Sequence, residues 1–298
     1  GLVGSEMCIR DRGVFGYVGS NNLNLLMPLG MFGSRLTGGK DSASPRYLNT
    51  KLDDLAKKIF IDYDFDILQH QSEDNCRIEP VYYAPIIPMI LVNGAEGIGT
   101  GYSTKIYPCN PRDIIANIKR LLTNENPKTM KPWFRHLTGT IEKIDGAKYI
   151  SRAKYEIIGK DTIHITDLPV GIWTDNYKAF LDNLIVQGTA QNAEEKKASK
   201  AVSSAKNTKT TTKAGSKTGS RTRKNPALAK KSQKSVTAKV AKKNPVASSI
   251  KTYSEDCTDI RISFTIVFHP GKLDTLIKSG KLDTGLKLVK PLNLTNMH

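Results

Sequence analysis

The stretch from Gly33 to Thr50 reads GSRLTGGKDSASPRYLNT and sets three cations, Arg35, Lys40 and Arg46, among glycines and small hydroxyl residues. Small residues let the backbone of a polyanion approach closely, and Lys and Arg neutralise its phosphates. Tyr47 follows directly. A phenol with a pKa of about 10 is a weak nucleophile, but a neighbouring guanidinium can stabilise the developing phenolate. The chain has 11 tyrosines, so composition alone does not select this one.

Two glycine-rich segments were tested as nucleotide-binding motifs, and both fail. In Gly33–Lys40, Ser34 stands where a phosphate loop needs its first glycine, and Asp41 stands where it needs a metal-binding Ser or Thr. Gly97–Gly101 has the wrong spacing for a dinucleotide fingerprint, and no helix start follows it directly. We therefore expect neither segment to bind a nucleotide.

The positive charge of the chain is concentrated in one segment. The net charge is +17, but 16 of the 45 Lys and Arg lie between Lys196 and Lys243, where no Asp or Glu occurs. The remaining 29 basic residues nearly balance 28 acidic ones. The surrounding segment, residues 192–247, has few large apolar side chains, so we expect it to be a disordered linker. A solvated spacer and a basic arm that contacts nucleic acid or directs nuclear import both remain open.

Composition limits the class of protein. Hydrophobic residues make up 39% of the 298, which supports a packed core, and no run of 18 apolar residues predicts a membrane span. The four cysteines, Cys8, Cys76, Cys109 and Cys257, have no zinc-site or disulfide spacing, which favours reduced thiols inside a cell. Residues 1–12 show no periodicity and are excluded from the fold. The lack of an initiator Met and the abrupt end at His298 lead us to expect a fragment.

Short periodic segments predict an α+β fold with two ordered blocks. In the first, residues 13–80, frequent Gly and Asn up to Asp41 indicate turns and short strands. Arg46–Asn49 is predicted to be a short strand. Thr50 is predicted to cap a helix, and the buried face of that helix carries Leu52, Leu55, Ile59 and Phe60.

The second block begins at about Val81. Its helices are expected to start at Asn110, to cover Asp175–Val186, and to include Leu273, Leu276 and Ile277. The first of these has a cap, a Pro in its first turn and a buried stripe formed by Ile114, Ile115, Ile118, Leu121 and Leu122. The predicted strands are Ile86–Val92, Gly139–Ile144, Tyr149–Ile158, Thr162–Thr166 and an alternating run from Ile260 to Phe268.

Several motifs together resemble the DNA breakage–reunion core of eukaryotic DNA topoisomerase II, a type IIA topoisomerase. VGSNNLNLL leads into GSRLTGGKDSASPRY, which is similar to the active-site tyrosine motif of that family. RIEP leads into PIIPMILVNGAEGIGTGYS, and LTGTIE and ITDLP follow in the family's order. The resemblance covers residues 13–191 and 249–298. Ser42, Thr37 and Met31 depart from the family's usual residues, which puts only DNA preference and drug sensitivity in doubt.

The resemblance implies roles for individual residues. Tyr47 matches the nucleophile that attacks a DNA phosphodiester to form a 5′-phosphotyrosyl bond, and Arg46 matches the arginine that holds the scissile phosphate. Ile98 matches an isoleucine that inserts between base pairs and bends the duplex. From the residue type alone, Ile98 would more often belong to a core. Arg35 and Lys40 are expected to contact DNA.

The resemblance also implies an architecture. Residues 13–80 would be the C-terminal part of a winged-helix domain, and residues 81–191 and 248–298 part of a tower-like domain, with the linker inserted in it. The full-length enzyme would be a nuclear homodimer that uses Mg²⁺ and ATP. Neither cofactor would be bound by residues of this segment, and no membrane would be involved. It would pass one duplex through a double-strand break in another, relaxing and decatenating DNA. The alternative is a non-enzymatic DNA-binding or chromatin scaffold that uses the basic linker.

Overall fold

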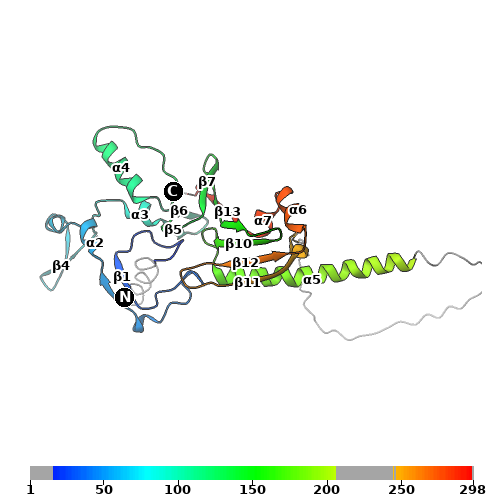
Figure 1. Ribbon diagram of the computed structural model, residues 1–298. Coiled ribbons are helices and arrows are strands. Elements are labelled where there is room, and N and C mark those ends of the chain that lie inside the picture. The colour runs from blue at the N-terminus through cyan, green and yellow to red at the C-terminus, as the bar shows by residue number, and fades with distance from the viewer. Residues whose placement is uncertain (1–15, 206–243, 245, 297–298) are drawn as a thin grey trace, which may run out of the picture.

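The computed structural model describes residues 16–205, 244 and 246–296. Within them the fold is mixed α/β, with two antiparallel sheets and three two-stranded ribbons (Figure 1). Each ribbon pairs neighbouring strands. These are β1 (Leu26–Leu29) with β2 (Asn49–Leu52), β3 (His70–Glu73) with β4 (Cys76–Pro80), and β5 (Ala95–Ile98) with β6 (Ser103–Ile106).

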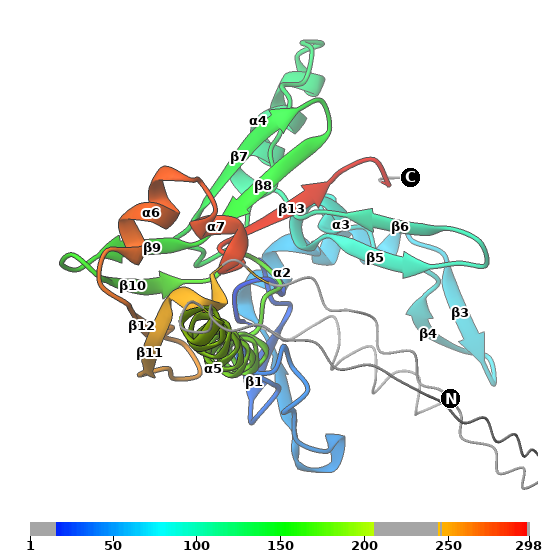
Figure 2. The ribbon, with the colours of Figure 1, turned by 90° about the vertical axis from the view of Figure 1, so that its right-hand side faces the viewer.

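The main core lies between a four-stranded sheet and a long helix. The strand order is β11 (Ile250–Glu255), β12 (Phe264–Phe268), β10 (Thr162–Asp167) and β9 (Lys154–Ile157). Alternate residues of β10 and β12 are buried, as a pleated strand with one covered face requires. Helix α5 (Thr174–Ala205) runs along the sheet and is seen almost end-on in Figure 2. It buries Tyr177, Leu181 and Leu184, spaced at helical intervals.

A three-stranded sheet continues from this core. Its order is β13 (Val289–Asn293), β8 (Lys148–Arg152) and β7 (Thr140–Asp145), with Phe134, Tyr149, Val170 and Leu292 buried together. Tyr149–Ile158, predicted as one strand, is two strands separated at Ala153, whose amide donates to Leu288 O at 2.8 Å. The chain passes at this point from one sheet to the other. Two short helices, α6 (Lys272–Lys278) and α7 (Leu282–Gly285), complete this part.

Helix α4 (Pro111–Leu122) begins where the sequence predicts. The Asn110 side chain caps it by accepting from the Arg112 amide at 3.0 Å. The predicted apolar stripe is only partly buried, however. Ile114 packs with Val92 in a small separate core, whereas Leu121 and Leu122 are exposed. The helix therefore contacts the core up to Ile118, and its last turn is exposed.

Three predictions around the first block are wrong. Arg46–Asn49 is no strand, because Pro45–Tyr47 forms a 3₁₀ turn (η1) and β2 starts at Asn49. The cap of α2 (Asp54–Ile59) is Asp53, which accepts from the Leu55 amide, while Thr50 lies within β2. The apolar run Ile86–Val92 leads into a short helix, α3 (Met89–Asn93). A short apolar run does not distinguish a strand from a buried helix turn.

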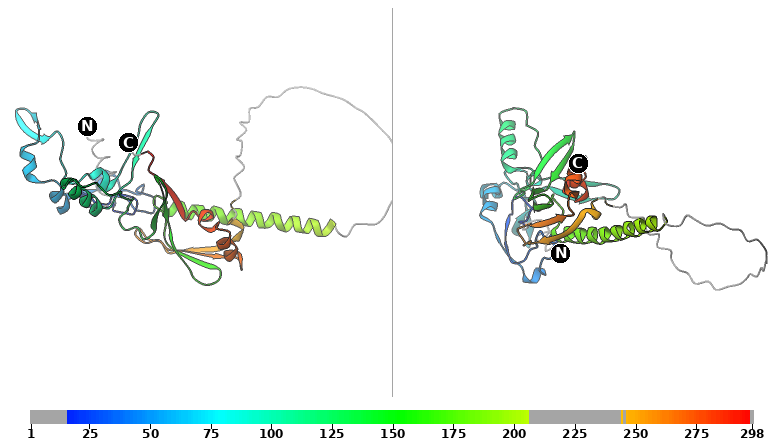
Figure 3. Two further views of the ribbon diagram at one scale, coloured as in Figure 1. Left: turned by 90° about the horizontal axis from the view of Figure 1, so that it is seen from above. Right: turned by 45° about the vertical axis from the view of Figure 1, so that its right-hand side comes forward.

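The predicted linker is also shorter than residues 192–247. Helix α5 continues past Val186 to Ala205 and extends away from the rest of the chain in both views of Figure 3. At the other end, Val246 and Ala247 are completely buried in the main core and precede the turn η3 (Ala247–Ser249). The prediction of disorder otherwise falls on residues 206–243 and 245, which lie outside the described part, as do residues 1–12.

Of the remaining predicted helices and strands, some are confirmed and others are shorter than expected. Helix α6 and strands β7 and β10 lie where the pattern predicts them. The alternating run is a strand only over Phe264–Phe268, and Ile260 is exposed in the preceding loop. Cys76, Cys109 and Cys257 are free thiols. None of the described helices is long and apolar enough to cross a membrane.

Candidate functional site

Tyr47 lies at the open end of the first ribbon. The ribbon register pairs Leu29 with Asn49, so the turn η1 sits where the two strands separate. The amide of Tyr47 donates to Ser44 O at 2.9 Å, and the ring is 71% exposed. Arg46 and Lys40 are exposed too. The phenol of Tyr47 and the cations of Arg46 and Lys40 are thus accessible from solvent, so that even a large ligand could reach them.

The loop that precedes Tyr47, residues 30–44, is closed on itself by Asp41. Its carboxylate accepts hydrogen bonds from the Ser34 amide at 2.9 Å, from the Ser34 hydroxyl, and from the Thr37 hydroxyl at 2.6 Å. Partial burial acts to raise the pKa of Asp41, but these hydrogen bonds outweigh it and hold the pKa below its usual value. Asp41 therefore fixes the fold of the loop six residues before the tyrosine.

The loop geometry also explains why this glycine-rich segment is no phosphate loop. The amides of Gly38 and Gly39 both donate to Ser34 O, at 3.1 and 3.0 Å, so they do not point to a ligand. Gly38 has φ +72°, and a Cβ built there would lie 2.3 Å from the Trp173 ring. The glycines serve close packing of the loop against the start of α5.

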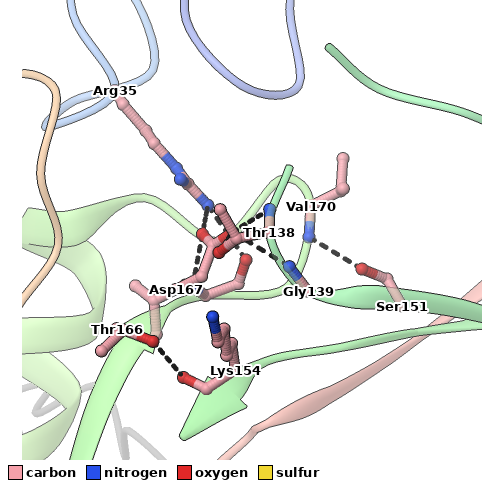
Figure 4. A network of polar contacts seen from close by, with 9 residues as sticks. Arg35, Thr138, Gly139, Ser151, Lys154, Thr166, Asp167 and Val170 are labelled. Atoms are coloured by element: carbon pink, nitrogen blue, oxygen red, sulfur yellow. Dashed lines mark hydrogen bonds and ion pairs between the residues drawn. The ribbon is translucent and has the colours of Figure 1, made fainter. Parts of the chain in front are cut away.

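Arg35 does not have the role that the sequence predicts. It is buried, and its guanidinium forms an ion pair with Asp167 at 2.7 Å, the two side chains being 7% and 3% exposed. The same nitrogen donates to Leu168 O at 2.9 Å. Figure 4 shows Arg35 pointing from the loop toward the end of β10. Because its charge is committed inside the protein, we remove Arg35 from the predicted DNA contacts.

Asp167 is a functional candidate that the sequence reasoning did not single out. One carboxylate oxygen accepts from the Thr138 amide and hydroxyl, both at 2.8 Å, and from the Gly139 amide at 3.2 Å. The other accepts from the Leu168 amide at 2.9 Å and pairs with Arg35. The signal was present, because Asp167 is the acidic residue of the quoted ITDLP motif.

Asn22 makes a second connection between distant motifs. Its buried amide nitrogen donates to Val92 O and Trp133 O, both at 3.0 Å, and its oxygen accepts from the Arg135 amide at 2.8 Å. The Asn93 side chain in turn accepts from the amides of Asn22 and Leu23. The stretches VGSNNLNLL and NGAEGIGTG are therefore in direct contact, although about 70 residues separate them.

Ile98 lies at the end of the β5–β6 hairpin and is 89% exposed. It is paired with Ser103, and the Gly99 amide closes the hairpin by donating to Tyr102 O at 2.8 Å. The expectation from residue type alone, that Ile98 belongs to a core, is therefore wrong. An apolar side chain at the tip of a protruding ribbon has the form of a wedge, and the hairpin excludes a dinucleotide-binding role for Gly97–Gly101.

The described residues show no group of three or more His, Cys, Asp or Glu side chains that could hold a metal ion. Asp41 and Asp167, the two acids of this site, already accept hydrogen bonds or ion pairs from within the protein. Among the described residues, this donor set therefore does not fit a magnesium ion.

Comparison with known proteins identifies the family. The family model of the A-subunit of DNA gyrase/topoisomerase IV matches residues 15–266. A Bombyx mori protein named DNA topoisomerase 2 is 58% identical over 162 residues, which is 54% of this chain. DNA topoisomerase 2 top-2 of Caenorhabditis elegans is 44% identical over 281 residues, 94% of this chain. The chain belongs to the DNA gyrase/topoisomerase IV A-subunit family, which confirms the resemblance to type II topoisomerases.

A solved structure agrees with this placement. The DNA-binding, cleavage and re-ligation domain of Plasmodium falciparum topoisomerase II is 34% identical, with a TM-score of 0.72 over 98% of this chain. The chain covers 32% of that protein, and only 10% and 15% of the Bombyx mori and Caenorhabditis elegans proteins. It thus corresponds to part of the breakage–reunion domain of much longer relatives.

Proposed function

We propose that this chain supplies the strand-cleaving segment of an ATP-dependent type II DNA topoisomerase, with Tyr47 as the nucleophile. The observation that carries the proposal is the exposed tyrosine beside exposed Arg46, on a turn that follows the loop closed by Asp41, inside the range matched by the family model. A 3₁₀ turn at a ribbon end presents both side chains on the surface, where a duplex can reach them.

The chemistry is a reversible exchange of one phosphodiester for another. The Tyr47 oxygen attacks the phosphorus and loses its proton to solvent or a general base, while the bond to the 3′ oxygen breaks and the 3′ hydroxyl leaves. The 5′ end remains attached through a phosphotyrosyl bond. The 3′ hydroxyl attacks in the reverse step, so resealing needs no nucleotide. Arg46 would stabilise charge on the phosphoryl oxygens as a fixed donor.

Ile98 would bend the duplex. An exposed apolar side chain that enters a base step exchanges lost stacking, about a few kcal/mol, for a bent duplex with more protein contact. Its exposure at the hairpin tip supports this role. Exposed Lys40 would neutralise a backbone phosphate near Tyr47.

The other domains of the whole protein would supply the functions that this chain lacks. We assign residues 13–80 to a winged-helix domain, and residues 81–191 and 248–298 to a tower-like domain. Parts outside this chain would supply the Mg²⁺ site, ATP hydrolysis and homodimer contacts. The protein would act in the nucleus on double-stranded DNA, in relaxation, decatenation and sister chromatid segregation. The scaffold alternative is not favoured, because it gives no role to a tyrosine displayed in the family's active-site motif.

Replacing Tyr47 with Phe tests the proposal. A complete enzyme is obtained by exchanging this chain for the matching segment of the Caenorhabditis elegans relative. Tyr47→Phe removes one oxygen and little volume, so DNA binding and ATP hydrolysis should persist while the covalent adduct, trapped by detergent, disappears. Arg46→Ala should leave residual cleavage about 100- to 1,000-fold slower. Tyr63→Phe is the matched control, since Tyr63 is 87% exposed. An adduct retained in Tyr47→Phe and mapped to another tyrosine would refute the assignment.

A further inference from the structure

The Arg35–Asp167 ion pair joins the loop of Tyr47 to the rest of the fold. Arg35 belongs to the loop that Asp41 closes, so whatever holds Arg35 also holds the segment that leads to the tyrosine. Its partner Asp167 ends strand β10, 132 residues later in the chain. The Asp175 amide adds a second link between the two regions by donating to Leu36 O at 3.0 Å.

The same carboxylate holds a third segment. Asp167 accepts from Thr138 and Gly139, which directly precede β7 at the edge of the three-stranded sheet (Figure 4). Through β8 this sheet continues to β13. All the acceptor positions of Asp167 are in use, by backbone amides, a hydroxyl and Arg35, and the group is buried. It therefore has no alternative arrangement that keeps its hydrogen bonds.

The far end of that sheet holds the hairpin of Ile98. Three residues beyond β13, Asn296 O accepts from the Lys105 amide at 2.8 Å and from the Thr104 hydroxyl at 3.1 Å, both in β6. Hydrogen bonds and short stretches of chain thus connect the wedge hairpin, through Asn296, β13, β8 and β7, to Asp167, and Arg35 connects Asp167 to the loop of Tyr47. The two exposed side chains are linked through the protein, by way of the buried pair Arg35 and Asp167.

We propose that the Arg35–Asp167 ion pair couples bending of the duplex at Ile98 to attack by Tyr47, with Arg35 and Asp167 as positioning residues. The proposal rests on the proposed function above. When Ile98 enters the base stack, the force on the hairpin passes to the sheet edge at Gly139 and then, through the ion pair, to the loop that sets the tyrosine. Such coupling is measurable as an interaction free energy between the two sites.

A double-mutant cycle measures it in the complete enzyme described above. The variants are Ile98→Ala, Arg35→Met and the double variant, each assayed for single-turnover adduct formation and for DNA bending by fluorescence transfer between labelled DNA ends. Ile98→Ala should slow cleavage about tenfold when Arg35 is present and less than about threefold in Arg35→Met, because the second loss removes the same coupling. Arg35→Met should leave the Kd for DNA and the bend angle unchanged. A general loss of structure would change both.

Arg152→Met is the matched control. Arg152 pairs with Glu142 at 2.7 Å within the same sheet, but it contacts no residue of the Tyr47 loop. In that background Ile98→Ala should keep its full effect. If Arg35→Met does not fold, Arg35→Lys keeps the charge without the planar guanidinium and enters the same cycle.

Additive effects of Ile98→Ala and Arg35→Met would overturn the coupling. So would an Arg35→Met enzyme that fails to bend DNA. Neither result touches the proposed function, which stands or falls with the adduct of Tyr47→Phe. A cycle that is non-additive only with Arg35, and not with Arg152, would establish the ion pair as the connection.

Discussion

The Tyr47 turn and the Ile98 hairpin each display one side chain on the surface, but different contacts hold them in place. Each displays one side chain to a large ligand, 71% and 89% exposed. The hairpin is held by its own four-residue ladder and, through β6, by the hydrogen bonds that Lys105 and Thr104 donate to Asn296 O. The tyrosine loop is held by Asp167 and by the start of α5, more than 130 residues away. The loop of the nucleophile is thus anchored through a buried ion pair, whereas the ion pair within the wedge hairpin, Lys105 with Glu96, is exposed.

The largest expected effect on stability comes from breaking the distant restraint. Arg35→Met leaves the Asp167 carboxylate buried without its cation, and such a loss typically costs about 3–5 kcal/mol. Urea unfolding of the chain, followed by circular dichroism, measures the change. Arg152→Met removes two partly exposed ion pairs, with Glu142 and with Asp283, each of which should contribute at most about 1 kcal/mol. Equal losses in the two variants would mean that the tyrosine loop is no better anchored than the surface.

Two glycines with similar backbone angles sharpen the comparison. Gly38 has φ +72° and faces the Trp173 ring, whereas Gly101, at the hairpin tip, has φ +87° and no neighbour within 4 Å. Alanine at Gly101 should cost about 1–2 kcal/mol from its backbone angle. Alanine at Gly38 should cost about 1–3 kcal/mol more, because the methyl group meets packed atoms. The difference in unfolding free energy between these variants isolates packing of the loop, and its absence would show that Trp173 moves away freely.

The smallest expected effect is that of Ile98→Ala on folding. A side chain exposed this far contributes little to the native state, so the free energy of unfolding should change by less than about 0.5 kcal/mol. Thermal unfolding of the chain without DNA checks this. A drop of several degrees in Tm would instead mean that the tip packs against the protein.

The sequence predicted what is local and missed what is distant. The start of helix α4 could be predicted because a capping Asn110, a proline and an aspartate follow one another, and the structure confirms it. Val246 looks like part of a basic linker, yet it is buried in the core through contacts with segments far along the chain. No periodicity reveals that Arg35 faces Asp167 rather than a ligand. The resemblance supplied Tyr47 and Ile98, but not the network between them.

The contact between Gly188 and Ala247 has a practical consequence for engineering. A Cβ built on Gly188 would lie 2.2 Å from Ala247 O, so the chain leaves the body and returns to it at one point. Residues 189–246 form a loop whose flanking residues, Gly188 and Ala247, are in contact, and lengthening such a loop costs only about 0.6 kcal/mol for each doubling of its length. This position should therefore accept a folded reporter, such as a fluorescent protein, in place of residues 206–243.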